Sequence, residues 1–318
     1  MRLGIPRGYF YYDYYLFIET LFHDSETELV FGEPNNEEIM QSGIALTVDE
    51  ACLPIKLMAG QVSSLINDCD IILIPRIMKD LAGRWLCPKL LGLPELMTSA
   101  VVSDKIYVTE PVHFNNKNRT RECFWKLCRK TGMKRTRFNN AFEKAFGRIA
   151  DVYAGRNNMH VEASWEFIPE EPGPDEILLP NTVNVLLAGH CYNIYDKFTN
   201  FNIMKKLDTL GIGAMTEGSV PHSEMEICIK KSGLIKEPFW EAFVRILGTA
   251  LYMRDKVDGI LYLSSFSCGL DAMIIEMLKS RVSDLPIMVV KIDEHRGEAG
   301  LDTRLEAFAD LLEKRRVS

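Results

Sequence analysis

The sequence predicts an α/β protein with two domains of mainly parallel sheet. Short apolar runs alternate with segments of helical periodicity, which is the order of elements that builds parallel sheets. This alternation stops at "IPEEPGPDEILLP", residues 168–180, and then starts again. The length of 318 residues suits two domains. We therefore expect an N-terminal α/β domain with a helical crossover at residues 1–167 and a C-terminal Rossmann-like domain at residues 181–318, facing each other across a central cleft.

The first half of the chain contains four candidate strands and four candidate helices. The run "DIILIPRI" is continuously apolar and rich in β-branched residues, as in a strand buried inside a parallel sheet. Strands are expected at residues 2–6, 27–32, 70–77 and 105–111. Helices are expected at residues 13–24 and 53–67 and, as two long patterns separated near "TGMKRT", over residues 118–157.

The second half repeats the same strand and helix order. Strands are expected at residues 183–190, 258–268 and 286–293. Helices are expected at residues 196–211, 238–256, 269–280 and 302–316. Asp196 is the candidate N-cap of the first of these helices, and Gly211 is its candidate C-terminal stop.

Charge and hydropathy argue against two classes of partner. The formal net charge is −7 and the lysines and arginines are scattered, so we expect no nucleic acid. No run reaches the 18 or so apolar residues of a membrane span, so we expect no membrane. The N-terminal residues carry no apolar core or cleavage site of a signal peptide, which predicts a cytoplasmic protein.

Three of the eight cysteines occupy places where chemistry is expected. Cys52 and Cys268 lie just ahead of predicted helices, and Cys87 follows a predicted strand. All three map to the sheet edge where strands end and helices begin. There the helix field favours the thiolate, which is the form that binds iron or zinc. For any one of them alone, the alternative is a small buried hydrophobe.

The cysteine set favours a cluster over other thiol chemistry. No CxxC pair occurs, so a zinc ribbon is not supported. Three cysteines without an obligatory fourth ligand suit a cubane iron-sulfur cluster with one open iron better than closed structural zinc. A nucleophilic cysteine paired with His190 is the competing hypothesis, and the sequence holds no local signature for it.

The segment "GHCYNIYD" at residues 189–196 follows a predicted strand and supplies further candidates. His190, Tyr192 and Asn193 are expected at the cleft as catalytic residues that shape a pocket. The alternative is a turn that opens a helix capped by Asp196. Neither a GxGxxG pattern nor a Walker A motif occurs, and "LGIGAM" lacks the flanking pattern of a dinucleotide loop, so NAD and ATP are not expected.

Seven short motifs in the same order resemble one known family. They are "LGIPRGYFYYDYY", "DEACLPIKLMAGQV", "DIILIPRI", "CPKLLGLPEL", "GHCYNIYD", "SSFSCGLD" and "DEHRGEAGLDTRLEAFAD". They resemble the family related to the 2-hydroxyacyl-CoA dehydratase iron-sulfur subunit. Within it, the chain is similar to the domain of unknown function found both free-standing and fused to CoA-dehydratase activase ATPases.

The resemblance implies a cofactor, its ligands and a partner. The cofactor is an iron-sulfur cluster, either 4Fe-4S or double-cubane 8Fe-9S, held between two Rossmann-like domains by Cys52, Cys87 and Cys268. The partner is an ATP-hydrolysing iron-sulfur activator protein, with a homologous partner subunit or a homodimer as further assemblies. One departure stands out, because many relatives have proline where this chain has Cys191. Cys191 is then an extra ligand, a resolving thiol or a neutral replacement.

Three functions follow as hypotheses. The first is low-potential electron transfer, or the reduction or dehydration of a small, CoA-linked substrate, driven by the activator. The second is a non-catalytic accessory or scaffold subunit that binds an activase or dehydratase partner. The third is a cysteine-dependent transferase acting on CoA thioesters.

Overall fold

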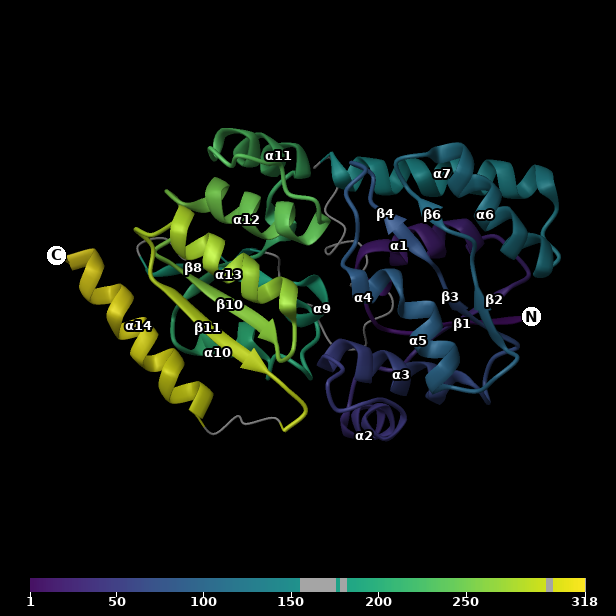
Figure 1. Ribbon diagram of the computed structural model, residues 1–318, viewed down its shortest axis with the longest axis horizontal. Coiled ribbons are helices and arrows are strands. Elements are labelled where there is room, and N and C mark those ends of the chain that lie inside the picture. Colours follow the sequence, from purple (N-terminus) through teal and green to yellow (C-terminus); the bar gives the residue numbers. More distant parts are fainter. Residues whose placement is uncertain (155–175, 178–181, 296–299, 318) are drawn as a thin grey trace. The chain divides into compact units, whose positions relative to one another are not determined.

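The computed structural model describes residues 1–154, 176–177, 182–295 and 300–317. The chain divides into two compact units, which we describe separately. The N-terminal unit comprises Met1–Met159 with Phe239–Glu241, and the C-terminal unit comprises His160–Pro238 with Ala242–Ser318. Both units contain a mainly parallel sheet flanked by helices, which confirms the predicted α/β fold class (Figure 1).

The sheet of the N-terminal unit has the strand order β2-β1-β3-β5, and all its pairings are parallel. Its strands are β1 (Arg2–Ile5), β2 (Glu28–Phe31), β3 (Ile71–Ile74) and β5 (Ile106–Val108). Two further strands, β4 (Ile77–Lys79) and β6 (Val112–His113), form a separate two-stranded sheet, and Lys79 also makes an isolated bridge with Trp85. The apolar run of β3 is fully buried from Ile72 to Ile74, as expected for a central parallel strand.

Two helices of this unit approach each other closely, and Cys52 directly precedes the second of them. Helix α2 (Glu37–Leu46) packs on helix α3 (Leu53–Leu65) through two glycines. A Cβ at Gly43 would overlap the carbonyl oxygen of Lys56, and one at Gly60 would overlap that of Ile39. Only glycine allows this approach, so the close packing of α2 on α3 depends on Gly43 and Gly60.

The N-terminal unit has five further helices. They are α1 (Phe10–Phe22), α4 (Pro88–Leu91), α5 (Leu93–Ala100), α6 (Lys117–Lys130) and α7 (Arg135–Tyr153). Of these, α1, α6 and α7 contribute to an aromatic core. Phe17 of α1 makes edge contacts with Phe114, Phe124 and Phe142 at centroid distances of 5.5, 4.7 and 5.9 Å. Such pairs contribute about 0.5–1.5 kcal/mol each beyond their buried area.

The C-terminal unit repeats the strand order of the first unit. Its strands are β7 (Glu176–Ile177), β8 (Asn184–Gly189), β9 (Gly213–Met215), β10 (Gly259–Ser265) and β11 (Ile287–Ile292), in the order β11-β10-β8-β9-β7. All pairings are parallel except that of β7 with β9. Its first parallel strand, β8, lies between β9 and β10 as β1 lies between β2 and β3. In such sheets, ligands bind at the carboxyl ends where the strand order reverses, which here is the end of β8 and β10.

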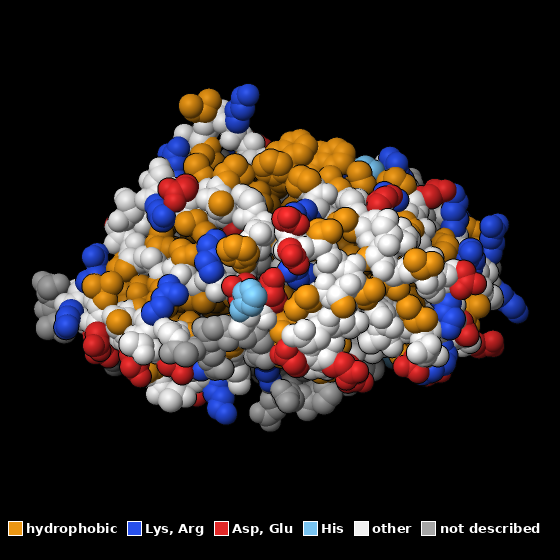
Figure 2. Space-filling model, turned by 60° about the horizontal axis from the view of Figure 1, so that its bottom comes forward, with side chains coloured by type: hydrophobic (Ala, Val, Ile, Leu, Met, Phe, Trp, Pro, Cys, Tyr) orange, Lys and Arg blue, Asp and Glu red, His pale blue; other side chains and the backbone are white. Residues whose placement is uncertain are grey.

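The helices of the C-terminal unit cover this sheet (Figure 1). They are α9 (Cys191–Ile194), α10 (Ile203–Thr209), α11 (His222–Lys231), α12 (Glu241–Met253), α13 (Gly269–Arg281) and α14 (Leu301–Val317), with a 3-10 turn at Glu217–Ser219. Helix α14 packs on β10, where a Cβ at Gly259 would lie 2.8 Å from Leu312. Within the described part of the chain, no helix combines the length and the apolar character that crossing a bilayer requires. Acidic and basic side chains are interspersed on the face drawn in Figure 2.

Most elements expected from the sequence are present, with shifted ends. Helices α1 and α12 differ from the predicted ranges by three residues at their N-termini, and Gly211 ends α10 with φ +68° as predicted. The predicted strand at residues 70–77 is wrong in one respect, because it breaks at Pro75 into β3 and β4, which belong to different sheets. The predicted boundary at residues 168–180 lies outside the described residues except for β7.

The predicted helix at residues 196–211 is wrong in its first half. The side-chain amide of Asn200 donates to the carbonyl oxygens of Asn193 and Ile194 at 3.1 and 2.6 Å, which holds the intervening residues in a loop. Helix α10 therefore begins only after Asn202, whose φ is 55°. Asp196 caps no helix and instead accepts the backbone N–H of Phe198 at 3.0 Å.

Candidate functional site

The three candidate cysteines share one structural position. Cys52 is the N-cap of α3, Cys87 of α4 and Cys268 of α13, each with extended backbone angles. A proline follows in the first turn of α3 and of α4, where its missing N–H has no helical partner to lose. Each sulfur is therefore held at a helix amino terminus, where the exposed N–H groups and the helix dipole favour an anion.

Cys52 lies in a neutral, buried setting. Its side chain is 5% exposed, and its Sγ lies 3.7 Å from the phenolic oxygen of Tyr9. Tyr9 follows β1 and has φ 31° and ψ −92°, a combination that non-glycine residues rarely adopt. Backbone strain of this kind costs on the order of 1–3 kcal/mol and persists where surrounding structure imposes it. The surrounding structure therefore imposes the backbone conformation of Tyr9, whose hydroxyl contacts Cys52.

Cys87 is half-buried and follows a short anchored segment. Trp85, two residues before it, stacks on Phe239 with ring centroids 5.9 Å apart. The backbone of Trp85 donates to Phe239 and accepts from Glu241, at 3.2 and 2.9 Å. The ammonium group of Lys79 lies over the Trp85 ring at 4.6 Å. These contacts fix the backbone that leads into Cys87.

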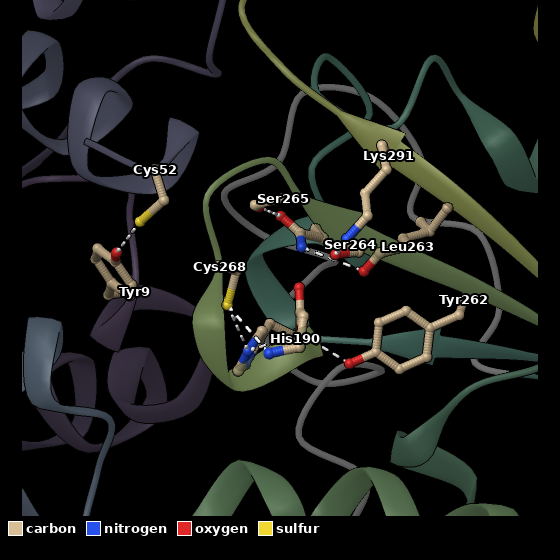
Figure 3. Close-up of polar contacts among 11 residues, drawn as sticks. Tyr9, Cys52, His190, Tyr262, Leu263, Ser264, Ser265, Cys268 and Lys291 are labelled. Atoms are coloured by element: carbon tan, nitrogen blue, oxygen red, sulfur yellow. Dashed lines mark hydrogen bonds and ion pairs between the residues drawn. The ribbon is translucent and has the colours of Figure 1, made fainter. Parts of the chain in front are cut away.

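Three different donor groups converge at the ends of β8 and β10 in the C-terminal unit. His190 directly follows β8, Cys268 follows β10, and Asp271 is the third residue of α13. The Nε2 atom of His190 lies 3.2 Å from Oδ1 of Asp271 and 3.9 Å from Sγ of Cys268. Each residue offers one atom of a type that can ligate a metal, and these atoms lie within 4.8 Å of one another. Among the described residues, we call this set the metal-type grouping. Figure 3 shows Cys268 facing His190.

Asp271 is held by contacts from three sides. Its backbone N–H donates to Sγ of Cys268 at 3.4 Å, which is the N-cap hydrogen bond of α13. The hydroxyl of Tyr262 donates to its Oδ1 at 2.7 Å. The side chain is fully buried, and its second oxygen, Oδ2, has no hydrogen-bond partner among the described residues. An acidic residue at this helix position often reaches back to the N-cap backbone, whereas this one faces His190.

Asn193 and Tyr192 hold the His190 loop in place. The hydroxyl of Ser265 donates to Oδ1 of Asn193 at 2.9 Å, and Nδ2 of Asn193 donates to the carbonyl of Leu263 at 3.4 Å. The ring of Tyr192 stacks on that of His190, with centroids 4.9 Å apart and an interplanar angle of 8°. These contacts tie the end of β8 to β10 and fix the imidazole plane.

The His190 and Asp271 side chains form a buried ion pair. Burial of His190 disfavours its cation, but the Asp271 carboxylate outweighs this effect and raises the pKa of His190 well above its usual value. Burial likewise opposes ionisation of Asp271, and the His190 charge and hydrogen bond outweigh it, so the pKa of Asp271 is lowered. Burial, and then the nearby Asp271 charge, raise the pKa of Tyr262 well above its usual value. Tyr262 therefore acts as a hydrogen-bond donor.

The His190 contacts do not have the geometry of a proton relay. In a nucleophile–histidine–carboxylate triad, the nucleophile and the carboxylate contact different ring nitrogens. Here Sγ of Cys268 and Oδ1 of Asp271 both approach the same nitrogen, Nε2. The nitrogen of His190, the sulfur of Cys268 and the carboxylate oxygen of Asp271 thus lie close together, within 4.8 Å of one another.

Four residues of this region, His190, Tyr192, Asn193 and Cys268, were candidates from the sequence. Asp271 and Tyr262 were not predicted. Asp271 was detectable, because it lies three residues after Cys268, at the helix position that capping patterns use. Tyr262 carried no signal beyond being a buried aromatic residue in a strand. Cys191, which follows His190, is buried and is not part of the metal-type grouping among the described residues.

Four of the other cysteines have the environment of structural thiols. Burial raises the pKa of each of them above its usual value, which keeps the group protonated. They are Cys69, Cys123, Cys128 and Cys228. A protonated thiol is a poor metal ligand and a poor nucleophile, so these four are not candidates for the site.

The fold and these positions define an α/β protein with cysteines at the amino termini of three helices. Residues 2–220 match the family model of the CoA enzyme activase uncharacterised domain (DUF2229). The match spans more than two thirds of the chain, and the chain belongs to this family. Cys52, Cys87 and His190 lie inside the matched residues, and Cys268 lies beyond them. No curated protein matches the chain.

Proposed function

We propose that this chain is an iron-sulfur protein of low-potential electron transfer, driven by an ATP-hydrolysing activator and serving reduction or dehydration of a small, CoA-linked substrate. The observation that carries the proposal is the common position of Cys52, Cys87 and Cys268 as helix N-caps. The family description, which connects this domain with CoA enzyme activases, supports the same function. We further propose kinship with the iron-sulfur subunit of 2-hydroxyacyl-CoA dehydratases, on the resemblance of the sequence motifs.

The side chains around these cysteines suit thiolate ligands. The described structure contains no disulfide at these residues. Cys268 receives a backbone N–H at 3.4 Å, and Cys52 has a hydroxyl at 3.7 Å. Hydrogen bonds to cluster sulfurs and low solvent exposure are the means by which proteins set cluster potential. A bound cluster, 4Fe-4S or 8Fe-9S, would supply one-electron chemistry; His190 and Tyr192 would shape the space beside it, and Asn193 would hold their loop.

An exposed side chain beside Cys268 supports a docking role for a partner. Phe266 lies two residues before Cys268 and is 59% exposed, and Met273 of α13 is 40% exposed. An electron donor has to approach a ligand closely, and apolar side chains at such a point favour protein contact. We propose the activator protein as this partner, with a homologous subunit or a second copy of the chain as further assemblies.

The test is iron and sulfide analysis after anaerobic purification and reconstitution. Wild-type protein is expected to hold iron and sulfide, and Cys52→Ser, Cys87→Ser and Cys268→Ser are each expected to lose most of both. Cys228→Ser is the matched control, because Cys228 is also half-buried but lies in α11. Iron-free wild type, or unchanged iron in all three variants, contradicts the proposal.

The second candidate is the accessory or scaffold subunit, which the exposed Phe266 also favours. It predicts a stable complex with the activator whether or not iron is present, and no turnover with a strong reductant. Binding measured with iron-loaded and iron-free protein separates the two functions. A complex that forms equally in both forms, with no electron transfer, supports the scaffold.

A further inference from the structure

We propose that His190, Cys268 and Asp271 form a site for a single divalent metal ion, which we name the triad site. Zinc is the ion that a nitrogen, a sulfur and a carboxylate oxygen donor suit best. The proposal concerns the iron-free chain and does not depend on the iron-sulfur function. It rests on the distances, on a carboxylate oxygen without a partner, and on the contacts that hold the ligands.

The distances match a shared centre. Zinc lies about 2.0–2.3 Å from nitrogen, oxygen and sulfur ligands in a tetrahedral site, which separates neighbouring ligand atoms by roughly 3–4 Å. In the triad site, Nε2 of His190 lies 3.2 Å from Oδ1 of Asp271 and 3.9 Å from Sγ of Cys268. Both contacts use one ring nitrogen, as they must if all three groups address one ion.

The buried carboxylate indicates a further interaction at this point. Asp271 is fully buried, and its Oδ2 has no hydrogen bond of normal geometry among the described residues, although the Ser264 side chain helps to lower the pKa of this carboxyl. A buried acceptor without a partner costs about 1–3 kcal/mol. A divalent ion would satisfy this carboxylate, and its two positive charges would balance the carboxylate and the Cys268 thiolate, with His190 as a neutral ligand.

Neighbouring side chains orient Asp271 and His190, as outer contacts do for the ligands of metal sites. Tyr262 donates to Oδ1 of Asp271 at 2.7 Å, and Tyr192 stacks on the His190 ring. Such outer contacts orient ligands and strengthen metal binding. The ligands come from the ends of β8 and β10, which are adjacent strands at the point where the strand order reverses. Three protein ligands leave a fourth coordination position open.

Cys268 belongs both to the triad site and to the three cysteines of the proposed cluster. A zinc ion at the triad site would occupy the sulfur that the proposed cluster also needs. Protein isolated in air is then expected to carry zinc, and the zinc has to leave before Cys268 can ligate iron.

The experiment uses the iron-free full chain titrated anaerobically with Co²⁺, whose thiolate complexes absorb light, followed by Zn²⁺. Wild type is expected to bind one Co²⁺ with thiolate-to-cobalt absorption, which Zn²⁺ then removes. Cys268→Ser is expected to abolish the absorption, and Asp271→Asn to weaken binding. Tyr262→Phe keeps all three ligands and is expected to weaken binding roughly 10–100-fold.

Cys52→Ser and Cys87→Ser are the controls, and both are expected to keep wild-type absorption and affinity. The proposal is overturned by wild type without stoichiometric absorption, or by equal loss in Cys52→Ser, Cys87→Ser and Cys268→Ser, which would indicate a three-cysteine site. Circular dichroism checks that each variant folds. Should Asp271→Asn not fold, unchanged affinity of Tyr262→Phe still overturns the proposal. Iron analysis after reconstitution is a separate readout, so failure of one proposal does not imply failure of the other.

Discussion

Cys52 and Cys268 occupy the same helix position in two units, but their surroundings are opposite. The helix behind Cys52 is buried without interruption from Leu53 to Val62, and the partner of its sulfur is the neutral phenol of Tyr9. The helix behind Cys268 buries a single face, and the sulfur lies beside the charged pair of His190 and Asp271. One thiol is positioned by packing and the other by charge.

A shared position at a helix amino terminus therefore does not determine which interactions hold a cysteine sulfur in place. At Cys268, a loss of charge is expected to do the greater damage, because the ion pair is buried and removal of one charge leaves the other uncompensated. At Cys52, a loss of one polar contact is expected to do little, because apolar packing of α3 already determines the position.

Asp271→Asn is expected to cause the largest loss of stability. It removes the carboxylate that compensates the buried His190 cation, and breaking a buried pair in this way costs about 3 kcal/mol or more. The measurement is the free energy of unfolding in urea. Asp302→Asn is the control, because Asp302 pairs with Lys206 at 2.7 Å but is 60% exposed, and its loss is expected to stay below about 1 kcal/mol. Equal losses would contradict the role of charge in the C-terminal unit.

The stabilisation from the ion pair is expected to depend on pH at both ends. The folded-state pKa of His190 lies above its usual 6.5, so its contribution is complete below pH 6.5 and is lost as the pH rises through the folded-state value. The pKa of Asp271 lies below its usual 3.8, so its contribution is present above pH 3.8 and is lost as the pH falls through the folded-state value. The difference in unfolding free energy between wild type and Asp271→Asn is therefore expected to be largest between pH 3.8 and 6.5. A difference independent of pH argues against the ion pair.

Gly189→Ala is expected to displace His190. Gly189 has φ +146°, and a Cβ there would lie 2.5 Å from the carbonyl oxygen of Leu263 on the neighbouring strand. We expect a cost of about 2 kcal/mol from backbone strain, with weaker Co²⁺ binding at the triad site. Gly147→Ala is the control, because Gly147 lies in α7 with nothing within 4 Å of the added Cβ, and it is expected to stabilise the chain by about 0.5–1 kcal/mol. Two changes of the same sign would refute the steric argument.

The two tyrosines give the smallest and most direct comparison. Tyr262→Phe removes a hydrogen bond to a buried carboxylate and is expected to cost about 1.5 kcal/mol or more. Tyr9→Phe removes a 3.7 Å contact with the Cys52 sulfur and is expected to cost less than about 1 kcal/mol. Thermal or urea unfolding of the iron-free variants measures both. A larger loss from Tyr9→Phe would reverse the contrast between the two units.

The fold was predictable where the signal is local. The apolar runs of β1, β3, β8 and β10 and the periodicity of α6, α7, α13 and α14 determine these elements within their own sequence. Helix α2 was missed although it carries a readable start, since Asn36 caps it and Glu37 and Glu38 occupy its first turn. The strand β9 was missed because three residues carry too little periodicity.

The site was predictable only in part. The helix positions of Cys52 and Cys268 follow from neighbouring residues, and Asp271 lies within the same local pattern. The contact of Cys268 with His190 joins residues 78 positions apart, which no local spacing encodes. The loop that the sequence assigned to a helix after Asp196 is likewise fixed by Asn200 through contacts outside any periodic pattern.

The most direct test of the central claim is electron paramagnetic resonance of the anaerobically reconstituted and reduced protein. If Cys52, Cys87 and Cys268 together ligate one iron-sulfur cluster, wild type and Cys228→Ser will show the signal of a reduced cluster. Each of the three ligand variants will lose it or change its shape. A signal that is absent from wild type, or unchanged in all three variants, would contradict the claim.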